Sequence, residues 1–315
     1  MRVTEAARTG ASAAALPAAS RPPRLGIELA LLCVLAGLWG SSYLLIKVAV
    51  ATIPPLTLIA MRVSIAAILL GSAMALSGIR FPRDWATWRM LLVQSVFNSI
   101  APWTLLAWGQ QYVDSGLAGV LNSTSPIFVF VITMLVTRHE AVSAMKLAGV
   151  MSGVIGVVLI VGIDALDGLG RHIAGQVAVL ASAVLYGCAA VFGKRLSSIP
   201  PLVPAAGTML LATIVLVPAS LVVDAPWTLH PRAVSIGAAV VLGLACTGVA
   251  MLIYFRLVRT LGSMGVTSQS YLRAGVSVLL GVVVLGEPIT LAIGAGLVAV
   301  IAGVALINFP RRQRD

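Results

Sequence analysis

Stripes of polar side chains interrupt the long apolar runs of this sequence. Trp39, Tyr43 and Lys47 recur at four-residue steps, which places them on one side of a helix. Gln94 and Asn98 repeat that spacing in another run. Together such groups offer hydrogen-bond donors, acceptors and an aromatic wall. This mixture suits a small zwitterion or an anion with an apolar part.

A third stripe contains Gln269 and Arg273, with Ser270 and Tyr271 between them. Arg273 lies near the middle of the helix expected there, too deep for its guanidinium to reach the membrane surface easily. We therefore favour a role in a solute cavity. The alternative is a structural hydrogen bond to carbonyl groups of a neighbouring helix.

The other polar residues within the apolar runs also have alternative roles. Lys47 is close to a helix end, so its ammonium either reaches the interface or contributes to a gate or solute contact. Gln94 and Asn98 either bridge helices or contact the solute. For Arg62 we favour a structural partner. Tryptophans near the ends of apolar runs are expected to be interfacial anchors: Trp85, Trp88, Trp103, Trp108 and Trp227.

The composition places these stripes in a lipid bilayer. Hydrophobic residues make up 59% of the 315 positions and charged residues only 10%, too few to cover a water-soluble surface. The net charge of +11 is spread in short clusters between apolar runs. We therefore expect no nucleic-acid partner.

The apolar runs predict ten membrane-spanning helices, so the expected fold is an all-α integral membrane protein. Polar or Pro/Gly-marked breaks separate the runs. We expect a disordered tail over 1–25 and a basic tail over 309–315. The expected spans are 26–48, 54–77, 88–107, 115–136, 143–163, 173–193, 201–223, 233–255, 263–285 and 290–308.

The sequence contains an internal duplication. A shift of 147 positions relates Gln269 to Asn122 and Glu287 to Glu140, and the register holds without a gap over more than 40 residues. Further back, an Ile-Pro-Pro-Leu motif at 53–56 recurs at 199–202, a shift of 146. The expected repeats are 26–163 and 173–308, with five crossings each. An odd number of crossings inverts the second copy, the architecture of secondary transporters.

The duplication and the polar stripes together define the expected solute site. Asn122 joins it as the counterpart of Gln269. The candidate substrate-binding residues are Arg273, Gln269, Tyr271, Ser270, Asn122, Asn98, Gln94, Tyr43, Trp39 and Lys47.

Positive charge predicts the orientation of the chain in the membrane. With both termini in the cytoplasm, most basic residues lie in inside segments, whereas the outside loops hold Arg171 and Arg232. The positive-inside rule therefore favours cytoplasmic termini in a multi-pass inner (plasma) membrane protein.

Several short motifs resemble a known family. The motifs are Leu38-Trp39-Gly40-Ser41-Ser42-Tyr43 through Lys47, Pro54-Pro55-Leu56 to Arg62, Ser125-Pro126 with Glu140, and Gly286-Glu287-Pro288 before Gly294 and Gly303. Over about residues 30–308 the chain resembles the drug/metabolite transporter superfamily, in its EamA-type ten-helix branch. The resemblance implies a bacterial inner-membrane carrier with a central cavity, often exporting amino acids or related metabolites. The chain departs from the family pattern at Arg273, where proline is common.

The expected function is alternating-access export of a small metabolite, most simply an amino acid or related compound. A channel-like pore, a multidrug or other-metabolite permease and a structural membrane subunit are the alternatives. The sequence has neither HExxH nor a phosphate loop, so we expect neither an enzyme nor a cofactor. Glu28 is the sole acid within an expected span, which favours facilitated diffusion or exchange over proton coupling. The oligomeric state stays open between monomer and homodimer.

Overall fold

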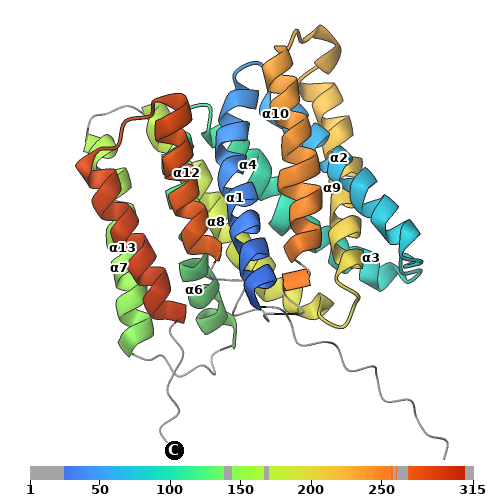
Figure 1. Cartoon of the computed structure of the whole chain (residues 1–315), viewed down its shortest axis with the longest axis horizontal. Helices are drawn as coiled ribbons and strands as arrows, with labels where there is room; N and C mark the ends of the chain where they lie inside the picture. The colour runs from blue at the N-terminus through green and yellow to red at the C-terminus, as the bar shows by residue number, and fades with distance from the viewer. Residues whose placement is uncertain are drawn as a thin grey trace, which may run out of the picture.

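The computed structural model describes residues 25–137, 144–166, 170–254, 256–257, 260 and 269–308, and these residues form helices joined by turns. Figure 1 shows the helices standing roughly side by side, with α1 between α12 and α10. The first half contains α1 Leu25–Val50, α2 Pro55–Leu76, α3 Trp85–Ser95, η1 Val96–Ile100, α4 Ala101–Gly109, α5 Ser115–Asn122, α6 Ser125–Thr137 and α7 Ala144–Leu166. The second half contains α8 Gly170–Gly193, η2 Lys194–Leu196, α9 Leu202–Val223, η3 Pro226–Thr228, α10 Ala233–Gly243, η4 Leu244–Val249, α12 Gln269–Leu285 and α13 Leu291–Asn308.

The helices have the lengths and composition of membrane spans. Among the described residues, seven helices are long and apolar enough to cross a bilayer. Three shorter apolar helices, Leu147–Gly156, Leu272–Leu285 and Leu291–Gly303, lie where the remaining three crossings were expected. The predicted all-helical membrane fold is therefore confirmed.

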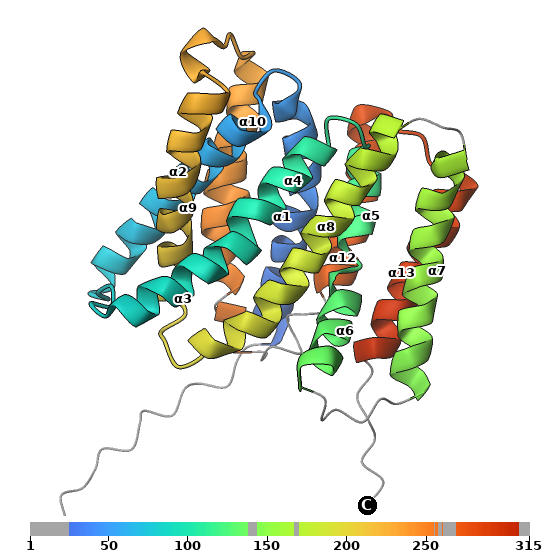
Figure 2. The ribbon, with the colours of Figure 1, turned by 180° about the vertical axis from the view of Figure 1, so that it is seen from behind.

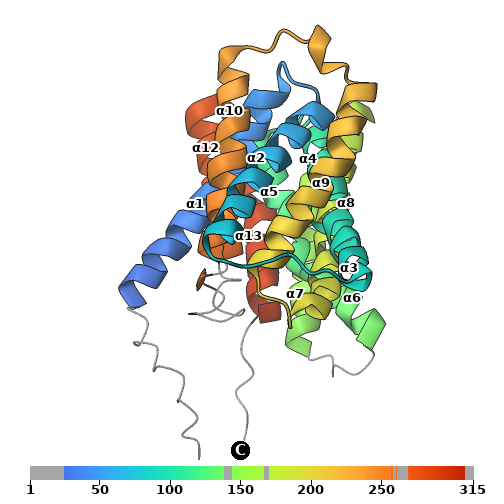
Figure 3. The ribbon, with the colours of Figure 1, turned by 90° about the vertical axis from the view of Figure 1, so that its right-hand side faces the viewer.

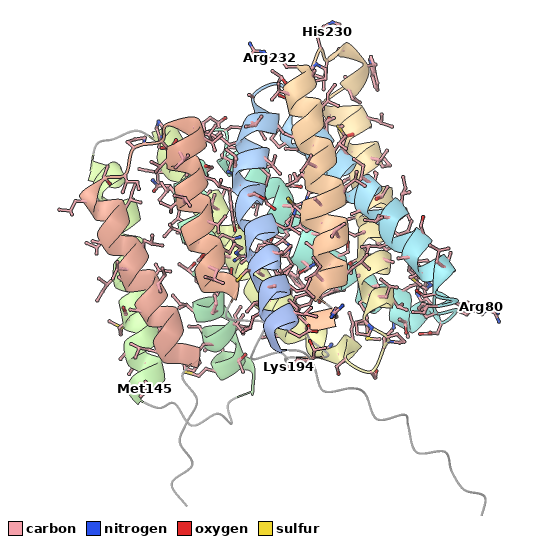
Figure 4. The ribbon with its side chains drawn as sticks, in the orientation of Figure 1. Arg80, Met145, Lys194, His230 and Arg232 are labelled. Atoms are coloured by element: carbon pink, nitrogen blue, oxygen red, sulfur yellow. The ribbon has the colours of Figure 1, made fainter. Side chains whose placement is uncertain are left out.

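The two ends of the described chain lie at the same end of the bundle. Leu25 begins α1 and Asn308 ends α13 there (Figure 1). We call this end the terminal face and the other end the opposite face. Arg80 and Lys194 lie near the terminal face, whereas Arg232 lies at the opposite face (Figure 4).

The second helices of the two halves repeat each other in three dimensions. α2 and α9 pack together, and Figure 3 shows them side by side. Their buried faces share positions 146 residues apart, as in the expected register. The shared buried positions are Thr57 and Val203, Ile59 and Ala205, Ala60 and Ala206, Arg62 and Thr208, Val63 and Met209, Ala66 and Ala212, Leu70 and Leu216, and Met74 and Ser220.

The third helices of the two halves share an irregularity. Each changes from α-helix to a short π-helix, at Val96–Ile100 in one half and Leu244–Val249 in the other. Such segments are rare and often occur at functional sites. Their occurrence at matching places indicates that the second copy kept the local backbone distortion of the first.

The fifth helices show the twofold relation most directly. α7 and α13 pack against each other at one edge of the bundle (Figures 1 and 2). A Cβ atom added to Gly156 would lie 2.8 Å from the oxygen of Gly296, and one added to Gly303 would lie 2.5 Å from the oxygen of Gly149. Each of these contacts is the other shifted by 147 positions. Ser152 Oγ also donates to Ala299 O (2.9 Å), a residue 147 positions away. Reciprocal contacts of this kind are those of a twofold axis, as the inverted repeats predicted.

The fourth crossing departs from its prediction as one unbroken helix over 115–136. It is divided into α5 and α6 at Ser123 and Thr124. Pro126 has no N–H to donate to the carbonyl of Asn122, and the hydroxyl of Ser125 donates to that carbonyl instead (2.6 Å). Discontinuous helices near the membrane centre are a feature of transporter binding sites, where they present backbone groups to a solute.

Candidate functional site

Arg62 of α2 lies in the interior and is only 5% exposed. Its Nε–H donates to Thr247 Oγ1 at 2.8 Å, and its guanidinium lies 3.8 Å from the centre of the Trp103 ring. Thr247 belongs to η4, where its hydroxyl also donates to Leu242 O (2.9 Å). The π-helical segment thus positions a hydroxyl acceptor, and α4 supplies an aromatic face to the same cation.

A second buried contact joins α1 to the end of α5. Asn122 Nδ2 donates to Tyr43 Oη at 2.7 Å, and both residues are 2% exposed. The carbonyl of Tyr43 accepts from Gln110 Nε2 (2.8 Å). Asn122 is the last residue of α5, so this contact lies at the break in the fourth crossing.

Tyr186 of α8 packs against the core that contains Tyr43 and Trp103, and its hydroxyl interacts electrostatically with Arg62, Tyr43 and Arg273. The Nε of Arg273 is buried and has no hydrogen-bond partner among the described residues. Buried donors are normally paired, so such an atom marks a place for water or a ligand. We call the following residues the central cluster: Tyr43, Arg62, Trp103, Asn122, Tyr186, Thr247 and Arg273.

The acids of the described chain lie away from the central cluster. Those with described side-chain contacts are all at helix ends. The contacts are Glu28 with Arg256 (3.0 Å), Asp84 with the Thr87 N–H (2.8 Å), Asp114 with Lys47 (4.0 Å), Asp224 with the Thr57 N–H (2.8 Å), and Glu287 with the Ser115 N–H (2.7 Å). Among described side chains, therefore, two arginines of the interior are not matched by a carboxylate.

Two of the other candidate residues have partners outside the central cluster. Lys47 donates to the carbonyl of Val113 (2.8 Å) near the opposite face. Trp39 packs against Tyr254, with ring centres 5.6 Å apart, beside a distinct apolar cluster.

The amides of the third crossing also lie in other surroundings. Gln94 lies beside Gly193 of α8, and its buried Oε1 has no partner among the described residues. Asn98 is in η1 and makes a long contact with Ser99 Oγ (3.4 Å). The side chains of Gln269, Ser270 and Tyr271 lie outside the part that the structure describes, as does all of Glu140.

Several members of the cluster were missed by sequence reasoning. The expectation that Trp103 anchors the chain at the membrane interface is wrong, because Trp103 is 4% exposed and lies under the Arg62 guanidinium. Trp85 and Trp227, by contrast, are 74% and 71% exposed, as interfacial anchors should be. Tyr186 and Thr247 were not singled out. The shift of 147 positions also relates Trp39 to Tyr186, and this relation was the available signal for Tyr186.

Comparison with known proteins agrees with the division of the chain into two halves. The profile of the EamA-like transporter family matches residues 25–162 and again 173–309. The chain is 27% identical over 270 residues to the uncharacterized inner membrane transporter YedA of Escherichia coli (strain K12), covering 84% of this chain and 86% of that protein. It is 28% identical over 289 residues to the uncharacterized transporter YvbV of Bacillus subtilis (strain 168), covering 88% and 90%.

A solved crystal structure is among those similar to this chain in three dimensions. It superposes with a TM-score of 0.65 at 18% identity and covers 91% of this chain and 99% of that one. At this level of identity the likeness shows the shared fold alone.

Proposed function

The chain belongs to the EamA-like transporter family of the drug/metabolite transporter superfamily, and from this premise we propose that it exports a small carboxylate-bearing metabolite by alternating access. The substrate class is an amino acid or a related compound. The protein lies in a bacterial inner membrane with both termini in the cytoplasm.

The observation that carries this proposal is the buried Nε of Arg273, which has no hydrogen-bond partner among the described residues. α12 packs against α1 and α5, so Arg273 belongs to a helix of the second half that contacts two helices of the first. A substrate carboxylate would supply the acceptor that this guanidinium needs. Tyr43, Asn122 and Tyr186 would supply further polar contacts at the same place.

Polar contacts between the halves support alternating access, because they close the opposite face. Asp224 accepts from the N–H and hydroxyl of Thr57 (2.8 and 2.7 Å). Glu287 accepts from the Ser115 and Gly116 N–H groups (2.7 and 2.9 Å) at the start of α5. A solute in the central cluster would leave through this face after the halves separate there.

The positions of the charges support the proposed orientation and coupling. Arg80 and Lys194 lie near the terminal face (Figure 4), and by the positive-inside rule they support a cytoplasmic location for that face. The described acids lie at helix ends, where they make the contacts given above. Exchange or facilitated diffusion therefore fits better than a relay of protons through buried carboxylates.

Counterflow in proteoliposomes tests the proposal. The full-length protein should take up labelled amino acids with saturable kinetics, and an internal unlabelled substrate should accelerate the uptake. Arg273→Leu should lose at least about nine-tenths of this flux, because one charge-assisted contact contributes roughly tenfold or more. The control is Arg232→Leu, which removes an exposed cation at the opposite face.

Unsaturable flux with measurable conductance would instead establish the channel alternative. Near-normal counterflow by the Arg273→Leu protein would assign Arg273 a structural role and remove the basis of the proposed site. Uptake of protons linked to the solute would contradict the exchange mechanism.

A further inference from the structure

Arg62 is a buried cation that the proposed carboxylate contact at Arg273 does not use. Within the described residues, the Nε–H of Arg62 donates to the neutral hydroxyl of Thr247. Trp103 covers one face of the guanidinium. A guanidinium has five N–H donors arranged for bidentate binding of an acid. Thr247 and Trp103 therefore hold Arg62 in place without neutralising it.

Arg62 and Arg273 both interact with Tyr186. The Tyr186 hydroxyl interacts electrostatically with both guanidinium groups, and the side chain packs against the core that contains Tyr43 and Trp103. No carboxylate among the described side chains contacts either arginine, since those acids have the helix-end partners given above. Two unmatched cations in the interior of a membrane protein are expensive, so their joint presence calls for an anion.

We propose that the central cluster binds a small organic anion with two acidic groups, one held by Arg273 and the other by Arg62. This inference rests on the proposed function, because it takes the same cluster as the substrate site. Tyr186, which interacts electrostatically with both cations, donates its hydroxyl to the bound anion. Binding neutralises both charges at once, which a substrate with one acidic group cannot do.

The repeat shows that Arg62 is not required by the packing of its helix. The equivalent position on α9 is Thr208, which is 4% exposed and donates its hydroxyl to Pro204 O (2.7 Å). The same buried face is thus built with a small neutral side chain in the second half. The charge of Arg62 has no counterpart at Thr208, so it lies off the twofold axis. A substrate with two different ends therefore has one preferred orientation.

Matched pairs of ligands test the second acidic group. Dissociation constants are measured by thermal shift of the purified full-length protein with succinate and its monoamide succinamate, and with glutarate and its monoamide glutaramate. Each diacid should bind about tenfold tighter than its monoamide or better, because the monoamide loses a charge-assisted contact.

Variants assign that preference to Arg62. Arg62→Thr, which copies the residue of the second half, should reduce the ratio between diacid and monoamide to within about twofold while monoamide binding persists. Arg62→Gln is the second variant if the threonine protein does not fold. Arg232→Leu is the control and should keep the wild-type ratio.

Equal affinity of diacid and monoamide for the wild-type protein overturns this inference, whatever the variants do. A diacid preference that persists in Arg62→Thr or Arg62→Gln also overturns it. In both cases the proposed function survives as long as counterflow of a monoacid depends on Arg273. Failure of every acid to bind, together with absent counterflow, overturns the proposed function as well.

Discussion

α2 and α9 are equivalent helices with different chemistry at one equivalent position. Arg62 of α2 reaches across to Thr247 of η4 in the third crossing of the other half. Thr208 of α9 makes the corresponding approach, and its carbonyl accepts from Ser95 Oγ (2.7 Å), which directly precedes η1. The backbone arrangement is repeated, but at this position a buried cation is present in α2 and not in α9.

This difference distinguishes the residues that helix packing requires from those that the candidate site requires. Burial of the same face in α2 and α9 is satisfied by small and apolar side chains, so the packing alone does not require an arginine. The first half also supplies Trp103, whereas the tryptophan of the second half, Trp227, is exposed and lies in the short η3 segment between α9 and α10. The cation and its aromatic support therefore occur together in one copy, as expected of a functional asymmetry on a symmetric frame.

The largest effect is expected when an arginine, the counterpart of Arg62, is placed at position 208 of the second half. Thr208→Arg would bury a guanidinium where no tryptophan supports it, at a cost of about 2.5–3.5 kcal/mol or more. We expect a loss of most monodisperse protein in detergent, measured by size-exclusion chromatography of a fluorescent fusion. Thr208→Val keeps the volume and is the matched control. A well-folded Thr208→Arg protein would show that both sides accept a buried cation, and the asymmetry would lose its functional meaning.

An intermediate effect is expected at the contact between α7 and α13, where the two halves are alike. Gly156→Ala and Gly303→Ala each place a methyl group against backbone of the facing helix, so each should lower the free energy of unfolding by about 1–3 kcal/mol. Gly294→Ala is the control, because a Cβ there meets nothing within 4 Å. Thermal midpoints in detergent measure all three. Markedly unequal effects at Gly156 and Gly303 would contradict the twofold contact between α7 and α13.

The smallest effect is expected at the starts of the third crossings. Asp84 caps α3 by accepting from the Thr87 N–H (2.8 Å), whereas Arg232, which occupies the N-cap position of α10, provides no side-chain cap. The hydrogen bonds from Thr87 lower the pKa of the Asp84 carboxyl. A lowered folded pKa stabilises the protein above the unfolded pKa of about 3.9, and this contribution is lost as the pH falls through the folded value.

Asp84→Ala should therefore lower the thermal midpoint slightly at pH 7, and the difference from wild type should shrink as the pH falls below about 4. Arg232→Ala should leave the midpoint unchanged under both conditions. A difference between Asp84→Ala and wild type that stays constant down to pH 3 would mean that the charge of the cap contributes nothing.

The fold was largely predictable from the sequence. Apolar runs of helical length place the crossings, and the 146- and 147-residue registers relate the halves, because lipid demands long apolar helices and duplication preserves their order. The break between α5 and α6 was not predicted. It depends on Pro126 and on the hydroxyl of Ser125, which are local signals that hydropathy alone does not weigh.

The candidate site was predicted less completely. Tyr43, Asn122 and Arg273 were chosen because they are polar within apolar runs, and the structure brings them into the central cluster. Trp39 and Lys47 satisfy the same rule, but their partners are Tyr254 and Val113, which are not part of that cluster. Periodicity shows which side chains share a face of one helix, and not which faces of different helices meet.

By itself, the sequence determined that this protein is a duplicated bundle of membrane helices, because the period and length of apolar runs are properties of single segments. The tertiary structure alone decided that Arg62 meets Thr247, 185 positions away, and lies on Trp103. Contacts of this kind depend on how rigid helices pack across the two halves, and no local pattern along the chain encodes that packing.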